Sequence, residues 1–170
     1  MKHEEYYGGD VPFIKSGDVK DRYVASGALW LTQEALTNTT AKYVPKGTVV
    51  VVVRSGILKH DLPVAIALNP LVINQDIKAF QPRSEFTSQY LAWAISSKED
   101  ELLSMTKAMT VDSIDSKVLY SIPVMVAPME LQLQFDAFIQ QLDKSKFELK
   151  QAIANISEMM KSLIQQDFSN

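Results

Sequence analysis

The sequence has no cysteine, only two histidines (His3 and His60), and no run of about 18 apolar residues. The lack of cysteine excludes disulfides, thiolate zinc sites, iron–sulfur clusters and cysteine nucleophiles. Two histidines leave little material for a histidine-based metal site, and we expect none. Without a long apolar run, or an apolar core near the N-terminus, we expect no membrane span and no signal peptide. The default location is the cytoplasm.

An excess of positive charge is also absent. The 170 residues include 17 basic and 20 acidic side chains, for a formal charge of −3. Residues 1–100 hold 11 of each sign, whereas residues 101–170 hold 6 basic and 9 acidic ones. Bulk charge therefore does not indicate a nucleic-acid binder, and any DNA contact must depend on a local basic surface in the first part of the chain.

Proline and glycine are confined to one part of the chain. All 7 prolines and all 6 glycines lie at or before Pro128, and the 42 residues that follow contain neither. This contrast predicts a globular domain over residues 1–127 and a helix over residues 128–170. We expect an α+β fold, in which a small domain with a twisted mixed sheet and short helices precedes one long coiled-coil-forming helix.

The five consecutive valines Val49–Val53 predict a strand in the middle of a sheet, because they are β-branched and apolar on both faces. Other strands are expected at residues 11–14, 64–68, 71–73 and 77–80, with an extended segment at 121–126. Short helices are expected at 31–36 with Thr32 as N-cap, at 84–95 and at 99–105.

Apolar residues recur every seven positions along the C-terminal part. From residue 129 to residue 168 a helix would be about 60 Å long, roughly twice the diameter of the preceding domain. The stripe therefore needs a partner, which is either a second helix or, for its first half, the chain's own domain. The residues expected to pair two copies of the chain are Phe135, Phe138, Leu142, Leu149, Ile156 and Leu163.

The sequence lacks the elements of a methyltransferase or a phosphotransferase. No glycine-rich phosphate-binding or methyl-donor loop is present, and Asn69-Pro70-Leu71-Val72 lacks the second proline and the aromatic residue of a target-amine element. We expect no catalytic residue. One alternative is a Mg²⁺-dependent nuclease, because Asp61, Asp76 and Lys78 follow an acid…acid-x-Lys pattern, although this pattern is common by chance.

Two loops are the best candidates for a ligand surface. The loop Arg54–His60 follows the valine strand directly and combines arginine, lysine and histidine with Gly56. Asn74-Gln75 is the second, because amide side chains can pair with adenine as arginine does with guanine. The alternative for both loops is ordinary turn chemistry.

An ordered set of segments resembles the target recognition domain of specificity subunits in type I restriction–modification systems. The segments are Gly8–Val19, Pro45–Val49, Arg54–His60, Leu62–Ala65 and Asn74–Ala79. Residues Ile122–Lys146 resemble the exit of this domain into the conserved spacer helix, which pairs and docks subunits.

The resemblance implies a DNA-reading subunit without a catalytic site or cofactor. S-adenosylmethionine belongs to partner methylation subunits, and a motor–nuclease subunit cuts. A typical subunit has two domains and two antiparallel helices, so this chain is similar to half of one. We expect it to pair with itself as an antiparallel homodimer, or alternatively to act as a truncated docking fragment. The residues expected to contact double-stranded DNA are Lys15, Ser16, Lys46, Arg54, Ser55, Lys59, His60, Asn74 and Gln75.

Overall fold

The computed structural model describes residues 4–39, 41–106 and 112–167, with side chains as far as Gln165. His3 and Phe168 lie outside these ranges. The chain divides into two compact units, Met1–Met129 and Glu130–Asn170, called the first and second unit below. Within the described residues no helix is both long and apolar enough to cross a membrane.

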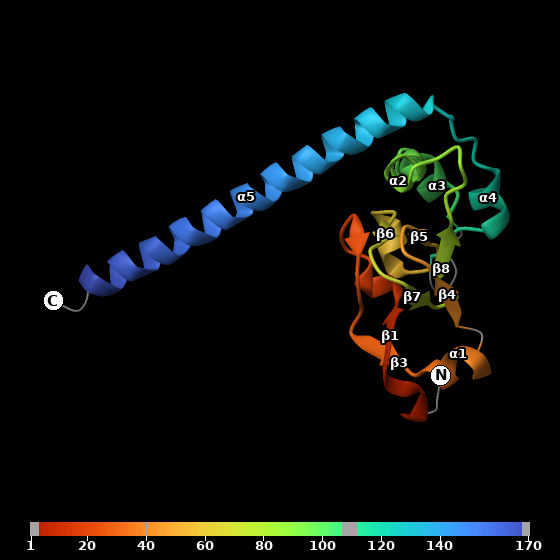
Figure 1. Ribbon diagram of the computed structural model, residues 1–170, viewed down its shortest axis with the longest axis horizontal. Helices are drawn as coiled ribbons and strands as arrows, with labels where there is room; N and C mark the ends of the chain where they lie inside the picture. The colour runs from red at the N-terminus through yellow and green to blue at the C-terminus, as the bar shows by residue number, and fades with distance from the viewer. Residues whose placement is uncertain (1–3, 40, 107–111, 168–170) are drawn as a thin grey trace. The chain divides into compact units, whose positions relative to one another are not determined.

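The first unit contains two four-stranded mixed sheets (Figure 1). In one sheet the order is β3-β1-β7-β4, with β1 and β7 parallel and the other pairs antiparallel. Its strands are β1 (Tyr7–Ile14), β3 (Leu29–Leu31), β4 (Lys42–Val44) and β7 (Leu71–Ile73).

The second sheet has the order β2-β6-β5-β8. Strand β5 is antiparallel to both β6 and β8, and β2 is parallel to β6. The strands are β2 (Tyr23–Val24), β5 (Val49–Val52), β6 (Val64–Ala67) and β8 (Ile77–Phe80). The valine strand is therefore in the interior of its sheet, as its sequence predicts.

The valines of β5 explain how the layers are held together. Val50 and Val52 belong to a buried cluster that both sheets share, together with Ile14, Leu71 and Ile73. Val49 and Val51 point to the other side, into a cluster with residues of α2, α3 and α4. A third cluster lies between the first sheet and α1. Burial on both faces is why all four positions are β-branched and apolar.

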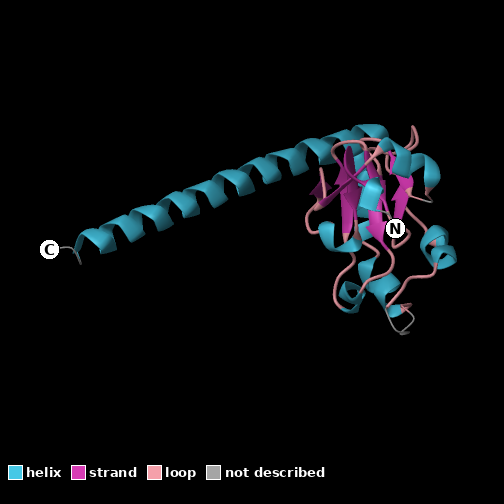
Figure 2. Ribbon diagram, turned by 90° about the horizontal axis from the view of Figure 1, so that it is seen from below, coloured by secondary structure: helices cyan, strands magenta, loops and turns pink. Residues whose placement is uncertain are grey.

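Three of the four short helices in the described residues begin at residues whose side chains cap them. The four helices are α1 (Gln33–Asn38), α2 (Ser88–Ser96), α3 (Glu99–Ser104) and α4 (Ser116–Ser121), with 3₁₀ turns η1 (Glu4–Tyr6), η2 (Ser16–Asp18) and η3 (Gly56–Lys59). Thr32, Thr87 and Asp115 accept a backbone N–H at the starts of α1, α2 and α4. Figure 2 shows the strands at the centre of the first unit with short helices around them.

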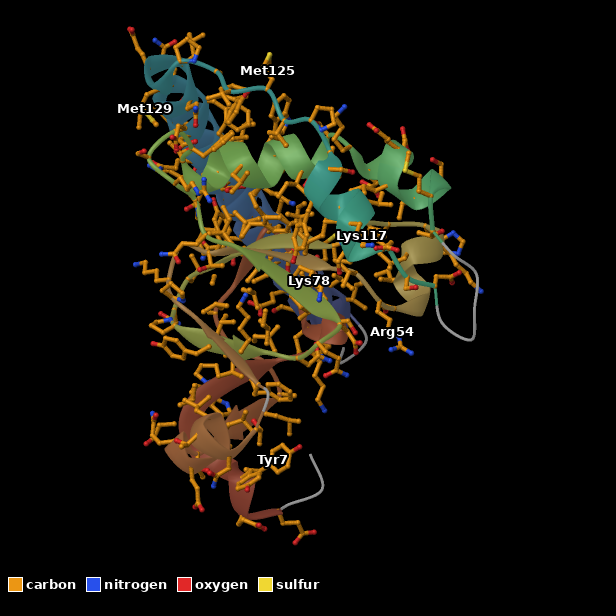
Figure 3. All side chains as sticks on the ribbon, turned by 90° about the vertical axis from the view of Figure 1, so that its right-hand side faces the viewer. Tyr7, Arg54, Lys78, Lys117, Met125 and Met129 are labelled. Atoms are coloured by element: carbon orange, nitrogen blue, oxygen red, sulfur yellow. The ribbon has the colours of Figure 1, made fainter. Side chains whose placement is uncertain are left out.

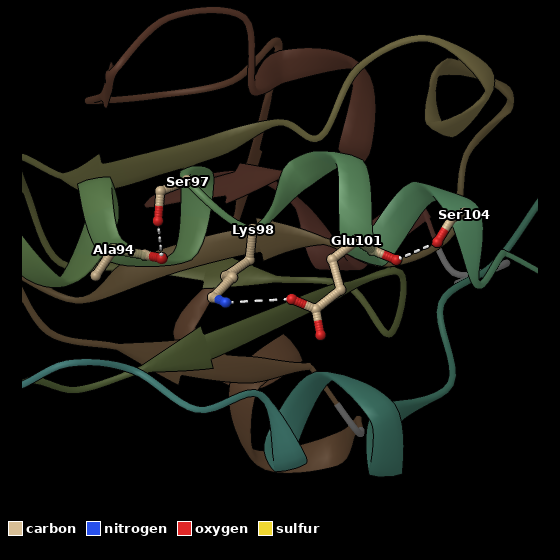
Figure 4. Close-up of polar contacts among 5 residues, drawn as sticks. All are labelled: Ala94, Ser97, Lys98, Glu101 and Ser104. Carbon is tan, nitrogen blue, oxygen red and sulfur yellow. Dashed lines mark hydrogen bonds and ion pairs between the residues drawn. The ribbon is translucent and has the colours of Figure 1, made fainter.

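The junction between α2 and α3 is fixed by local contacts (Figure 4). The Ser97 hydroxyl donates to the Ala94 carbonyl at 2.8 Å, and the Ser104 hydroxyl donates to that of Glu101 at 2.7 Å. Lys98 Nζ lies 3.2 Å from Glu101 Oε2. Lys98 therefore already has an acidic partner.

The expected α+β fold with a mixed sheet and a long C-terminal helix is confirmed, with the strands divided between two sheets. Several local predictions are wrong. Strand β1 begins at Tyr7, not at residue 11, and Leu31 belongs to β3 and not to a helix. Helix α2 begins at Ser88, not at residue 84, because Thr87 provides the N-cap. Helix α4 is missing from the prediction, and residues 122–126 pair with no strand, so the last extended segment forms no part of a sheet.

Helix α5 (Met129–Asp167) comprises 39 residues without a break. Its length is about 58 Å at 1.5 Å per residue. Large apolar side chains stay exposed along it, among them Phe138, Leu142, Leu149, Ile156 and Leu163. Lys144 and Glu148, one turn apart, lie 3.9 Å from each other on the helix surface. An exposed apolar stripe of this length is unsatisfied hydrophobic surface.

Candidate nucleic-acid interface

Strands β1 and β7 end at the same edge of their sheet. They run parallel with Ile14 opposite Ile73, so the next residues, Lys15 and Asn74, are neighbours. Strand β4 is antiparallel to β7 on its other side and begins at this edge, with Lys42 opposite Ile73. Lys15 and Lys42 therefore flank the strand that leads into the turn 74–76.

The same turn also contacts the end of β5 in the second sheet. Val53 N–H donates to the Asp76 carbonyl at 2.8 Å, and Val52 is opposite Ile77 in the β5–β8 ladder. Arg54 directly follows Val53 in the sequence, and Figure 3 shows it projecting away from the body of the first unit. We call the segments 15–18, 54–60 and 74–76, together with Lys42, the loop edge. Four segments that are distant in the sequence thus meet around one turn.

Three cations of the loop edge have no acidic partner in the part of the chain that the structure describes. Lys15, Lys42 and Arg54 are exposed, and none forms an ion pair with another residue of the described ranges. Lys15 Nζ lies 5.9 Å from the centre of the Phe13 ring, a weak cation–π contact. Lys42 was not among the residues predicted from the sequence. Only the register of β4 against β7 brings it here, and nothing in its local sequence indicates that register.

The two amides of the turn have different roles. Asn74 Nδ2 donates to Asp76 Oδ2 at 2.9 Å, and Asn74 Oδ1 is buried without a hydrogen-bond partner among the described residues. Asn74 is therefore committed to the turn, and Asp76 acts locally, as its position suggests. Gln75 is exposed, and its side chain has no hydrogen bond within the described part of the chain. Gln75 is thus the amide available to an adenine edge, which offers one acceptor and one donor.

The remaining residues of the 54–60 loop are partly engaged. The Ser55 hydroxyl accepts from Ile57 N–H at 3.5 Å and caps η3. Lys59 Nζ lies 3.8 Å from Asp112 Oδ2, with the lysine side chain 65% exposed and the aspartate 11%. A lysine this exposed contributes little through such a pair and can turn to another anion. His60 is exposed, and its backbone N–H donates to the Ile57 carbonyl.

The structure does not bring Lys46 to this group. Lys46 is exposed in the turn before β5, where Gly47 N–H donates to the Ala67 carbonyl. Arg54 lies beyond the opposite end of the same strand, and the six residue steps from Thr48 to Arg54 span about 20 Å at about 3.3 Å per residue. Ser16, in contrast, is half-buried at the start of η2 beside Lys15. Eight of the nine residues expected to contact DNA thus lie in the loop edge.

The residues of the alternative nuclease site do not form a metal-binding group. Among the described residues, no three acidic or histidine side chains are placed to hold a metal ion. Pro63, two residues after Asp61, pairs with β5 from the β6 side, whereas Asp76 pairs with it from the β8 side. Asp76 is also held by Asn74. The acid…acid-x-Lys spacing in the sequence does not become a cluster in the fold.

The arrangement has the components of a double-stranded DNA contact. Lysine and arginine neutralise phosphates, and an exposed glutamine between them can read a base edge. The cations also come from a domain whose overall charge is near zero, so their grouping at one edge creates a local field that the total charge hides. The Asn74–Asp76 hydrogen bond fixes the turn and so holds Gln75 in place.

Residues 1–158 match the family described as "Type I restriction modification DNA specificity domain". A type I restriction enzyme specificity subunit of Escherichia coli is 31% identical over 144 residues, which is 84% of this chain and 36% of that protein. Another from Methanocaldococcus jannaschii is 33% identical over 100 residues, 57% of this chain and 22% of that one. The chain thus spans about a third or less of the length of these curated relatives.

Solved structures share the fold. One, from work on complex assembly and conformational transition of the type I restriction–modification system, has a TM-score of 0.69 at 22% identity and covers 96% of this chain and 39% of its own. The HsdS subunit of Thermoanaerobacter tengcongensis has a TM-score of 0.63 at 21% identity, with 88% of this chain and 34% of its own covered.

Proposed function

Because the chain belongs to the type I restriction modification DNA specificity domain family, we propose that its first unit recognises a short double-stranded DNA sequence through the loop edge. The observation that carries this proposal is the grouping of Lys15, Lys42 and Arg54 around the exposed Gln75. The cations hold the phosphates, and Gln75 and Arg54 contact base edges in the major groove.

The chain itself does no chemistry in this proposal. Methylation subunits that carry S-adenosylmethionine modify adenine, and a motor–nuclease subunit translocates and cuts DNA, all in the cytoplasm. The loop edge then determines where these subunits act. The near-neutral charge of the first unit is consistent with this division, because partner subunits add their own DNA contacts.

Helix α5 supplies the assembly surface. Its exposed stripe recurs every seven residues, the spacing of a seam between two helices. A second copy is the simplest partner, because an antiparallel pair brings identical stripes together around a two-fold axis. Such a homodimer carries two identical loop edges, so its target consists of two identical half-sites in opposite orientation.

The test is to sequence the methylated bases of cells that produce the chain with its methylation subunits. We expect adenine methylation within one two-part palindromic sequence. Gln75→Ala should relax the base preference at one position of each half-site. Arg54→Ala should weaken DNA binding by a factor of about 5 to 150 if it holds a base in bidentate contact, or weaken all sequences alike if it holds a phosphate.

Lys46→Ala is the matched control, because it also removes one exposed cation from the first unit but at the opposite end of β5. It should leave both the methylated sequence and the affinity unchanged. An unmethylated genome, with the chain still bound to the methylation subunits but not to DNA, would instead identify a docking fragment. Methylation of a sequence without two-fold symmetry would contradict the homodimer.

A further inference from the structure

A second basic group lies beside the loop edge, where strand β8 meets helix α4. We propose that Lys78 and Lys117 bind the DNA backbone together, as a phosphate contact that extends the interface beyond the loop edge. The inference rests on the proposed function and adds a contact that carries no base preference. The ligand chemistry is a phosphodiester, and the occupant is the same DNA duplex.

The segment before α4 lies along residues 53–55, next to the start of β8. Ile114 N–H donates to the Val53 carbonyl at 2.9 Å, and Ser113 forms an isolated antiparallel bridge with Arg54. Ser55 N–H donates to the Asp112 carbonyl at 3.2 Å. Residues 112–114 are therefore hydrogen-bonded to the start of the loop edge, and α4 follows directly from them.

The end of α4 packs on the end of β8. The rings of Tyr120 and Phe80 meet edge to face, with their centres 5.7 Å apart. Phe80 is opposite Val49, and Lys78 is opposite Val51, in the β5–β8 ladder. Residues 114 to 120 therefore run back along the sheet from the level of Val53 to that of Val49.

These two anchors place Lys117 at the level of Lys78. Ile114 is level with Val53, which directly follows β5, and Tyr120 is level with Val49. Lys117 is midway between Ile114 and Tyr120 in the sequence, so it is level with Val51, the residue opposite Lys78. Lys78 also shares a strand face with Phe80, two residues on, and Lys117 shares a helix face with Tyr120, one turn on. Because the two rings touch, the two lysines are on the faces that meet. Figure 3 shows Arg54, Lys78 and Lys117 on one side of the first unit.

Neither lysine is neutralised. Lys78 is half-buried and Lys117 exposed, and neither forms an ion pair with another residue in the described ranges. Two like charges at one level repel each other, and an anion between them removes that repulsion. Tyr120 is 62% exposed beside them, so its hydroxyl is available to donate to a phosphate oxygen.

Continuity with the loop edge favours DNA as the occupant. Arg54 and Val51, which marks the level of Lys78, are three residues apart on one strand, or about 10 Å. This distance is about the axial rise of three nucleotides along one DNA strand. A backbone that passes Arg54 therefore reaches the lysine pair without leaving the surface.

The test is DNA binding by the complex with methylation subunits, measured by fluorescence anisotropy at several salt concentrations. The double variant Lys78→Ala/Lys117→Ala should reduce the slope of log affinity against log salt by about 1.8. The ratio of the DNA affinity of the unmodified complex to that of the variant should accordingly fall about 12-fold between about 50 and 200 mM salt. The deficit should be equal for the methylated sequence and for a scrambled duplex, because phosphates carry no sequence.

Two further variants make the result specific. Lys78→Arg/Lys117→Arg keeps both charges and should keep the slope. Lys46→Ala/Lys161→Ala removes two exposed lysines from elsewhere in the chain and should also keep it. An unchanged slope in the alanine variant overturns the inference while leaving the proposed function intact. Failure of the unmodified complex to bind DNA at all overturns the proposed function instead. Equal competition by inorganic phosphate and by duplex DNA would show a free-phosphate site and would also overturn the inference.

Discussion

Replacing Leu149 and Ile156 together by aspartate should convert a dimer of the chain into monomers. Both residues belong to the seven-residue stripe of α5, and their side chains are 63% and 57% exposed. Full burial of such a side chain contributes about 1.5–3 kcal/mol, so covering the exposed part contributes about 1–2 kcal/mol each. The loss over both helices is therefore about 4–8 kcal/mol, before the cost of placing four carboxylates in an apolar seam.

That loss corresponds to a dimer at least about 700-fold weaker, at about 1.4 kcal/mol for each factor of ten. Sedimentation velocity over a range of concentrations measures it, with methylation subunits absent and then present. The first unit should stay folded, which the fluorescence of Trp30 and Trp93 reports. A two-site DNA target should no longer be bound as one unit.

The matched control is Phe147→Asp/Ala154→Asp. These two residues are also seven apart and exposed, but they lie on the face of α5 opposite the stripe. The control adds the same number of carboxylates and should leave the dimer intact. If both variants dissociate equally, helix stability rather than the stripe explains the effect. If the unmodified chain is monomeric at high concentration with and without methylation subunits, the pairing itself is wrong.

Three other predictions concern the first unit. Gly9→Ala should destabilise the β1–β3 pairing, because the added Cβ would overlap the Leu31 carbonyl oxygen; hydrogen exchange at β3 would show it, and unchanged protection would contradict it. Asn74→Ala should lower the free energy of unfolding by about 0.5–1.5 kcal/mol through the lost bond to Asp76, whereas Gln75→Ala should leave urea unfolding unchanged. Thr87→Ala should cost about 0.5–2 kcal/mol through loss of the α2 cap, and Thr87→Ser should restore most of it in thermal melts.

The fold could be predicted where one stretch of sequence determines the structure. Val49–Val53 has no polar face because β5 is buried on both sides, and Thr32 caps α1 through its own hydroxyl. Strands β2, β3 and β4 were not predicted, because none of these two- or three-residue segments shows a period of its own. Helix α4 was missed for a related reason, since its six residues are held by the Asp115 cap and by packing on Phe80.

The sequence indicated which residues lie in the candidate site better than it indicated what each side chain does there. Arg54 and Gln75 follow strands and stay exposed, which the order of residues already suggests. Lys42 reaches the site only through the register of β4 against β7, and Lys46 leaves it because the turn before β5 is at the far end of the strand. That Asn74 supports the turn rather than facing outward depends on where the Asp76 carboxylate lies. Such pairings are properties of the folded chain.

The four residues of the loop edge that are offered to DNA belong to none of the buried clusters. Lys15 directly follows β1 and Lys42 begins β4, whereas Arg54 and Gln75 each come two positions after a strand, β5 and β7. The buried clusters draw mainly on the strands themselves and on the short helices. A mutation at these four positions therefore leaves the apolar packing as it was. In the proposed function this separation makes the domain readily evolvable: a lineage can change the DNA sequence that its methylation and restriction act on by drift at a few exposed positions, with the scaffold and the assembly helix inherited unchanged.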